Sequence, residues 1–226
     1  VYLYDFGLES DPSLSVARDY VSMLGTENKT LAQIMGEQYE LACDVSFSPS
    51  KTNFYVTISG IAENMPAAMA LAEEYMDDVK GDETVLAEVK NDILKERANS
   101  KTNQRANYNA LQRYVTYGSD YVERTTLSNE ELEALTSDYL IDKIHNLKNY
   151  QHRILYYGPQ SKKSLVGMLN RYHAVAENLI PVEYKSTPNI PVTEPKVIFA
   201  QYDAKQIYYM QYTCGNDMFD VALDPQ

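Results

Sequence analysis

Apolar residues recur at helical spacing between residues 14 and 26, and this stretch predicts a helix that faces the core. The inward positions, three or four residues apart, are Leu14, Ala17, Val21 and Leu24, and the outward positions are Ser15, Arg18, Asp19 and Ser22. Asp11 can cap the start, Pro12 fits the first turn, and Gly25 is expected to take the left-handed turn that ends the helix.

Alternation of apolar and polar residues predicts the strands of a sheet. Residues 1–9 alternate first, and residues 43–48 and 54–59 then form an antiparallel hairpin around a Pro-containing turn. Residues 152–157 have the composition of one more strand.

Helical spacing fills most of the remaining chain. A capping box at Thr30 and Gln33 opens a helix whose buried side is expected to comprise Leu31, Ile34, Met35 and Tyr39. Further helices are expected over residues 64–81, 104–117 and 128–147, and from Ser161 or Ser164 toward His173. A long helix is also expected to start at Asp82, with inward residues as far as Leu94. The 128–147 helix opens with a second capping box, at Ser128 and Glu131. This order of elements predicts an α+β fold, with an antiparallel or mixed sheet covered on one face by helices.

Four prolines between residues 181 and 195 interrupt any helical period and predict an extended linker. We therefore expect one domain over residues 1–185, a linker over 186–195 and the beginning of a second domain over 196–226. Two strands are expected in this last part, at 197–202 and 207–213.

Charge and composition exclude several classes of function. Acidic residues outnumber basic ones by 32 to 20, and the net charge of -12 argues against binding to nucleic acid. No apolar run approaches the roughly 20 residues of a membrane span, and no signal segment opens the chain. Because the chain begins inside a strand pattern, we expect it to be a fragment or a processed chain. Cys43 and Cys214 are too few and too far apart in sequence to imply a disulfide framework, so the sequence does not indicate the cellular compartment.

Three segments resemble the pitrilysin/insulinase family of zinc metallopeptidases. They are the strand-like VYLYDFGLES, the Leu-Gly-Thr end of the first helix, and the hairpin YELACDVSFSPSKTNFYVTISG. Catalytic members carry H-x-x-E-H on the equivalent helix, in which two histidines bind zinc and the glutamate activates a water molecule. Counted back from Gly25 and Thr26, these positions hold Val16, Asp19 and Tyr20. The resemblance therefore implies a half domain without the zinc motif.

The remaining candidate residues give weaker signals. Glu96 lies near the place where the family has its third zinc ligand, but it is also part of the charged run Lys95-Glu96-Arg97, which is typical of an exposed helix face. The three histidines, His145, His152 and His173, lack ligand spacing. His152 and His173 are interpreted as surface or satisfied structural residues. Twenty tyrosines are unusual. Core packing is the favoured interpretation, and a peptide-gripping cavity is the alternative for Tyr108, Tyr114, Tyr117 and Tyr121.

The leading hypothesis is an inactive, non-zinc-binding domain of a larger zinc metallopeptidase. By the resemblance, such a half domain helps to form the chamber that holds peptide substrates, while a partner half domain supplies zinc and catalysis. No cofactor is expected in this fragment. The alternatives are a structural scaffold without peptidase activity, and a hydrolase with a different metal site that uses Glu96 and a histidine. Self-association through residues 196–213 is a further expectation, because a lone apolar hairpin seeks another strand.

Overall fold

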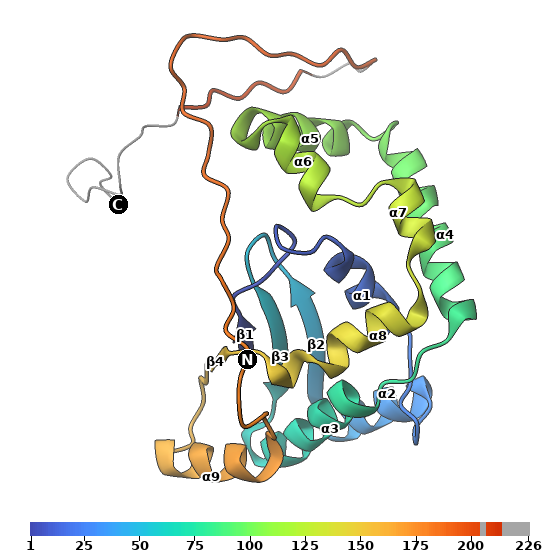
Figure 1. Cartoon of the computed structure of the whole chain (residues 1–226), viewed down its shortest axis with the longest axis vertical. Coiled ribbons are helices and arrows are strands. Elements are labelled where there is room, and N and C mark those ends of the chain that lie inside the picture. Colours follow the sequence, from blue (N-terminus) through green and yellow to red (C-terminus); the bar gives the residue numbers. More distant parts are fainter. Residues whose placement is uncertain (204–206, 214–226) are drawn as a thin grey trace, which may run out of the picture. The chain divides into compact units, whose positions relative to one another are not determined.

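A computed structural model describes residues 1–203 and 207–213 of the chain (Figure 1). The chain divides into two compact units, and each is described by itself. The first consists of residues 1–94 and 125–186, and the second of residues 95–124 and the segment from 187 onward.

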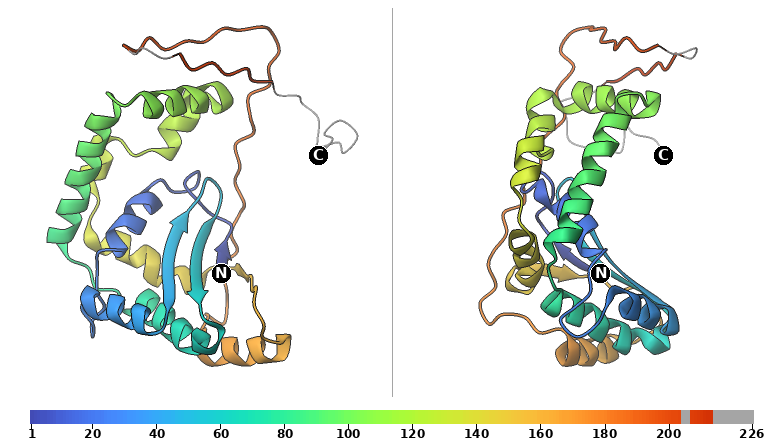
Figure 2. Two further views of the ribbon diagram at one scale, coloured as in Figure 1. Left: turned by 180° about the vertical axis from the view of Figure 1, so that it is seen from behind. Right: turned by 90° about the vertical axis from the view of Figure 1, so that its right-hand side faces the viewer.

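The first unit is built on a four-stranded sheet in the order β2-β3-β1-β4. The strands are β1 (Tyr2–Tyr4), β2 (Cys43–Pro49), β3 (Phe54–Gly60) and β4 (His152–Ile154). Every pairing is antiparallel, with Tyr4 opposite both Phe54 and His152. The hairpin β2–β3 is seen clearly in the left view of Figure 2. The predicted α+β fold is confirmed, although β1 and β4 are shorter than the alternation predicted.

Helices make up most of the rest of the first unit. They are α1 (Ser13–Val21), α2 (Leu31–Glu40), α3 (Met65–Asp78), α7 (Asn129–Ala134), α8 (Ser137–His145) and α9 (Lys162–Tyr172), with short 3-10 turns at Ala62–Asn64 and Leu147–Asn149. The helix α4 (Glu83–Ser100) begins in this unit and ends in the second, which also contains α5 (Gln104–Tyr117) and most of α6 (Ser119–Thr125).

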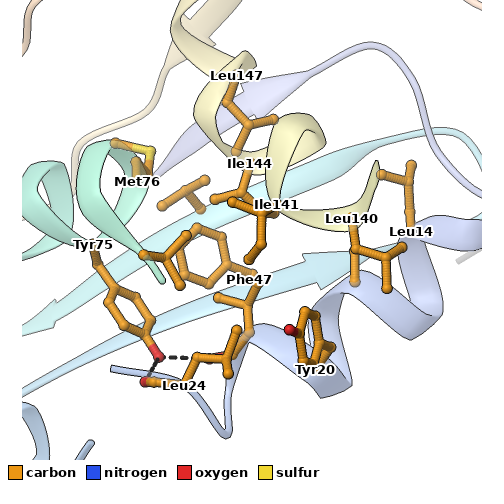
Figure 3. Close-up of a cluster of buried hydrophobic side chains, with 14 of the residues drawn as sticks. Leu14, Tyr20, Leu24, Phe47, Tyr75, Met76, Leu140, Ile141, Ile144 and Leu147 are labelled. Atoms are coloured by element: carbon orange, nitrogen blue, oxygen red, sulfur yellow. Dashed lines mark hydrogen bonds between the residues drawn. The ribbon is translucent and has the colours of Figure 1, made fainter. Parts of the chain in front are cut away.

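One face of the sheet carries the core of the first unit. Paired residues of antiparallel strands point to the same side, so Tyr2, Tyr4, Phe54 and Val56 share a face, and all four are buried. They form one cluster with residues of α1, α3 and α8. Figure 3 shows residues of α8 around the ring of Phe47, and Tyr75 of α3 reaching α1. The Tyr75 hydroxyl donates to the carbonyls of Val21 and Leu24 at 2.6 and 2.8 Å.

The first helix has the predicted inward face but a different end. Leu14, Ala17, Val21 and Leu24 are all buried. The helix α1 ends at Val21, and Gly25 lacks the positive φ expected of a left-handed cap. Gly25 has another function in the turn, since a Cβ there would lie 2.3 Å from the Lys29 carbonyl oxygen. That turn is closed by the Thr26 N–H, which donates to the same oxygen at 2.8 Å.

Both predicted capping boxes are present, at Thr30 for α2 and at Ser128 for α7. The expected buried side of α2 is wrong at two positions, because Met35 and Tyr39 are 61% and 87% exposed. The single helix expected over 128–147 is also wrong, since it is broken between α7 and α8. Leu135 adopts an extended conformation there, and the Thr136 hydroxyl caps α8 by accepting from the Tyr139 N–H at 3.3 Å.

Residues 181–203 contain no helix or strand. The two strands predicted at 197–202 and 207–213 are not formed among the described residues, and part of the turn predicted between them lies outside those residues. Within the second unit this segment contacts α5 and the turn before it. The Tyr208 ring lies 5.1 Å from that of Tyr108, and the Tyr202 hydroxyl donates to the Thr102 carbonyl. Side-chain contacts to helices have replaced the expected strand pairing.

Candidate functional site

The positions that match the zinc motif lie on α1, and two of the three face the core. Val16 is 2% exposed and Tyr20 is fully buried. Asp19 lies on the outer side, where its Oδ1 accepts from Arg18, with 2.7 Å between Arg18 Nη2 and Asp19 Oδ1. Arg18 and Asp19 therefore form an exposed ion pair. Such an exposed pair contributes little to stability.

The hydroxyl of Tyr20 joins α1 to the starts of two other helices. It accepts from the Asp82 N–H at 2.6 Å, lies 2.9 Å from the Asp82 carbonyl oxygen, and lies 2.6 Å from the Ser137 hydroxyl. A tyrosine hydroxyl has one hydrogen and two acceptor sites, so these three contacts use its whole capacity. Tyr20 is therefore a structural bridge between α1, α4 and α8.

These residues do not fit a zinc ion. Valine has no donor atom, and the Tyr20 oxygen is already saturated with hydrogen bonds. Glu96 is exposed on α4, in the second unit. Within the part of the chain that the structure describes, no group of three or more His, Cys, Asp or Glu side chains is arranged to hold a metal ion.

A second cluster, which the sequence did not predict, joins four elements of the first unit. Its members are Tyr2 of β1, Glu73 of α3, His152 of β4, and His173, which caps the C-terminus of α9. His152 Nε2 and His173 Nε2 are 2.8 Å apart. His173 Nδ1 lies 2.7 Å from Glu73 Oε1, and the Tyr2 hydroxyl donates to the same oxygen at 2.7 Å.

This cluster is shielded from water. The His173 side chain is 4% exposed and the Glu73 side chain 10%. Burial, with the nearby charge of Glu73, raises the pKa of the Tyr2 hydroxyl far above its usual value, so Tyr2 acts only as a neutral donor. The interpretation of His152 and His173 as satisfied structural residues agrees with these contacts. Their mutual contact was not visible in the sequence, because 21 residues separate them.

His145, the remaining histidine, has a different hydrogen-bond partner. Its Nε2 lies 3.1 Å from the Val79 carbonyl oxygen. The four tyrosines considered for a peptide-gripping cavity differ in exposure. Tyr121 is buried and stacks near Tyr117, with ring centroids 4.4 Å apart, whereas Tyr114 is about half exposed.

Comparisons with known proteins connect this fold to a class of peptidases. No protein-family model and no curated protein sequence matches the chain. Solved structures do match. The chain is similar to the periplasmic protease PqqL from Escherichia coli, with a TM-score of 0.62 and 15% identity, over 83% of this chain and 21% of that one. It is similar to a protease from Helicobacter pylori, with a TM-score of 0.61 and 15% identity, over 83% of this chain and 46% of that one.

An inactive domain of an M16 peptidase from Pseudomonas fluorescens is also similar, with a TM-score of 0.53 and 16% identity, over 64% of this chain and 36% of that one. Over most of its length, the chain therefore has the fold of an M16, or pitrilysin-like, peptidase domain. The chain spans less than half the length of each of these three proteins.

Among the described residues, no helix has the length and apolar character needed to cross a membrane.

Proposed function

We propose that this chain is a non-catalytic half domain of an M16-like zinc metallopeptidase. It forms part of the wall of a chamber that holds peptide substrates. Zinc and the catalytic groups come from a partner half domain in the same protein or assembly. The observation that carries this proposal is that buried packing residues, Val16 and Tyr20, occupy the two positions on α1 where the zinc motif has histidines.

The packing of α1 in the first unit supports a structural, non-catalytic role for this helix. In a catalytic helix, the first and last motif positions must present imidazole nitrogens to a metal. Here Val16 is packed in the core and Tyr20 is hydrogen-bonded to Asp82 and Ser137. Tyr20 therefore stabilises the attachment of α1 to the starts of α4 and α8, and Val16 contributes to the hydrophobic core.

The sheet supports the binding of an extended peptide. β2 lies at one edge of the sheet, and among the described strands it pairs only with β3. A sheet edge can bind an extended peptide through main-chain hydrogen bonds. A half domain without catalytic groups can therefore still hold a substrate strand.

The catalytic part of the proposal is tested by zinc content and peptide cleavage. After dialysis, the chain should contain no stoichiometric zinc and should cleave no unfolded peptide. One zinc per chain that is lost in Glu96→Gln would contradict this and would favour the alternative metal site.

Restoring the motif gives a sharper test. The triple variant Val16→His, Asp19→Glu and Tyr20→His is expected to bind zinc weakly at best and to remain inactive. The groups that orient zinc ligands and the partner half domain would still be missing. Peptidase activity of this variant alone would show that the chain is a nearly complete catalytic half.

Peptide binding separates the chamber wall from a structural scaffold. The probes are a fluorescent extended peptide rich in Val, Thr and Tyr, and a copy with alternate backbone nitrogens methylated. Each main-chain hydrogen bond contributes about 0.5–1.5 kcal/mol, so methylation should weaken binding by about tenfold or more. Equal binding of both peptides would contradict strand addition, and binding of neither would favour the scaffold.

A further inference from the structure

The contacts of His152 and His173 in the first unit need three hydrogens on or between the two rings, one more than two neutral imidazoles carry. The Tyr150 carbonyl can only accept, so His152 Nδ1, 2.8 Å from its oxygen, must carry a hydrogen. The contact between His173 Nδ1 and Glu73 Oε1 needs a second hydrogen, and the contact between the two Nε2 atoms needs a third. Two neutral rings supply only two. With an ionised Glu73, one nitrogen lone pair would face another at 2.8 Å.

The position of the additional proton follows from the surroundings of each ring. Burial lowers the pKa of His152, and the neighbouring His173 lowers it further, against the opposing effects of the Tyr150 carbonyl and Glu73. His152 is therefore the neutral acceptor. His173, in contact with the Glu73 carboxylate, holds hydrogens on both nitrogens and donates one to each neighbour.

We propose that His152 and His173 form a proton-binding pair that holds the C-terminal end of α9 against β4 and α3 only while one proton is shared between their Nε2 atoms. The pair connects elements that are otherwise distant in sequence. His173 is the C-cap of α9, His152 lies in the edge strand β4, and Glu73 lies in α3. No other group in this cluster can replace the shared hydrogen, because Tyr2 already donates to Glu73.

The titratable groups that face the pair are few. They are Glu73 from α3, together with Tyr2 and Tyr4 from β1. Burial raises the pKa of both tyrosines, so they stay neutral over the physiological range. Several other charged groups on the surrounding elements have partners away from the pair: Lys148 with Asp77, Arg153 with Asp5, Lys29 with Glu74, and Arg171 over the Tyr172 ring.

A proton fits the space between the rings better than a metal ion does. Zinc bonds to imidazole nitrogen are about 2.0–2.1 Å long, which at a tetrahedral angle places two nitrogens about 3.3 Å apart. The observed 2.8 Å is a hydrogen-bond distance. A structural zinc site also needs four ligands, and no third ligand accompanies the pair among the described residues.

The pair should therefore hold α9 most firmly in the middle of the pH range. Without the shared proton, two lone pairs face each other across the Nε2–Nε2 contact and the contact is lost. On the acidic side, His152 is neutral in the folded chain because its pKa is lowered. Its contribution is thus present above the ordinary histidine pKa of about 6.5 and is lost as the pH falls below it, when a second proton would oppose the first.

Nitrogen NMR of the intact chain with labelled histidines tests this directly. At intermediate pH we expect one imidazolium and one neutral ring, with a scalar coupling between the two Nε2 atoms through the shared hydrogen. His145 serves as the internal reference. Two neutral rings throughout the titration, without this coupling, would overturn the proposal. So would one equivalent of zinc that is lost in His152→Gln.

Hydrogen exchange of the α9 amides tests the structural consequence. We expect exchange to be slowest at intermediate pH, after correction for the intrinsic rate, and about tenfold faster at either extreme. The matched variants His173→Gln and His145→Gln remove one histidine each, and only the first should abolish this pH dependence. An unchanged profile in His173→Gln would overturn the proposal, and if that variant does not fold, the exchange profile of the unsubstituted chain decides.

Discussion

Tyr2 and Tyr4 both lie on the buried face of β1 but differ in one hydrogen bond. The Tyr2 hydroxyl donates to Glu73, whereas the Tyr4 hydroxyl has no hydrogen-bond partner in the described structure. Removing a hydroxyl that satisfies a buried acceptor costs about 1–3 kcal/mol. Removing an unpaired one relieves a desolvation cost instead.

We therefore expect Tyr2→Phe to lower the free energy of unfolding by about 1–3 kcal/mol. Tyr4→Phe should leave it unchanged or raise it by up to about 1 kcal/mol. Urea denaturation of the two variants measures both values. Equal losses would mean that the hydroxyl of Tyr4 is satisfied, or that the Tyr2–Glu73 bond contributes nothing.

A second residue pair tests the inward and outward positions predicted for residues 14–26, just beyond the end of α1. Leu24 is buried in the core, and Ser22 is exposed beyond the last turn of the helix. Leu24→Ala should destabilise the chain by about 2–5 kcal/mol, because it leaves a cavity. Ser22→Ala should change stability by less than about 0.5 kcal/mol. Similar denaturation midpoints for the two variants would refute the assignment.

At the scale of elements, local signals predicted the helix starts better than the helix faces. The capping boxes at Thr30 and Ser128 both appear in the structure, because a cap depends on residues only three apart. The faces depend on what each helix meets. Met35 and Tyr39 have helical spacing, yet only Ile34 of α2 is buried. Spacing alone shows which residues share a face, and it does not show how far the core extends over that face.

Two glycines test how the effect of an added Cβ on stability differs between a helix and a tight turn. Gly36 lies in α2, where an added Cβ would have no atom within 4 Å, whereas a Cβ at Gly25 would lie 2.3 Å from the Lys29 oxygen. Gly36→Ala should stabilise the chain by about 0.5–1 kcal/mol, because alanine favours the helix. Gly25→Ala should destabilise it by about 1–3 kcal/mol through overpacking. Thermal unfolding gives both signs, and stabilisation by Gly25→Ala would contradict the close approach.

At the scale of the whole molecule, the fold class was predictable and the histidine cluster was not. The order of strands and helices predicted an α+β fold, because each element has its own period. The contact of His152 with His173 and Glu73 depends on how α9 returns to α3 and β4, and no spacing in the sequence encodes it. The motif positions on α1 could be located by resemblance, whereas the bonding of Tyr20 to Asp82 and Ser137 required the structure.

The segment after the linker presents several large apolar side chains to solvent. Among its described residues, Val197, Phe199, Ile207 and Tyr209 are all at least 83% exposed. Contiguous exposed apolar surface favours association. We therefore expect self-association through residues 196–213, even though the strands predicted there are not formed among the described residues.

Light scattering over a range of concentrations tests this expectation with three chains. The intact chain should form dimers or larger species, and a chain that ends at Val192 should remain a monomer. The matched control is Phe199→Ser with Ile207→Ser, which removes exposed apolar surface but retains Tyr202 and Tyr208, the residues that contact Thr102 and Tyr108. This double variant should also be a monomer. If the intact chain is itself monomeric and its tail is cut rapidly by protease, association through this segment is refuted. If the double variant associates as strongly as the intact chain, the contact surface lies elsewhere on the molecule.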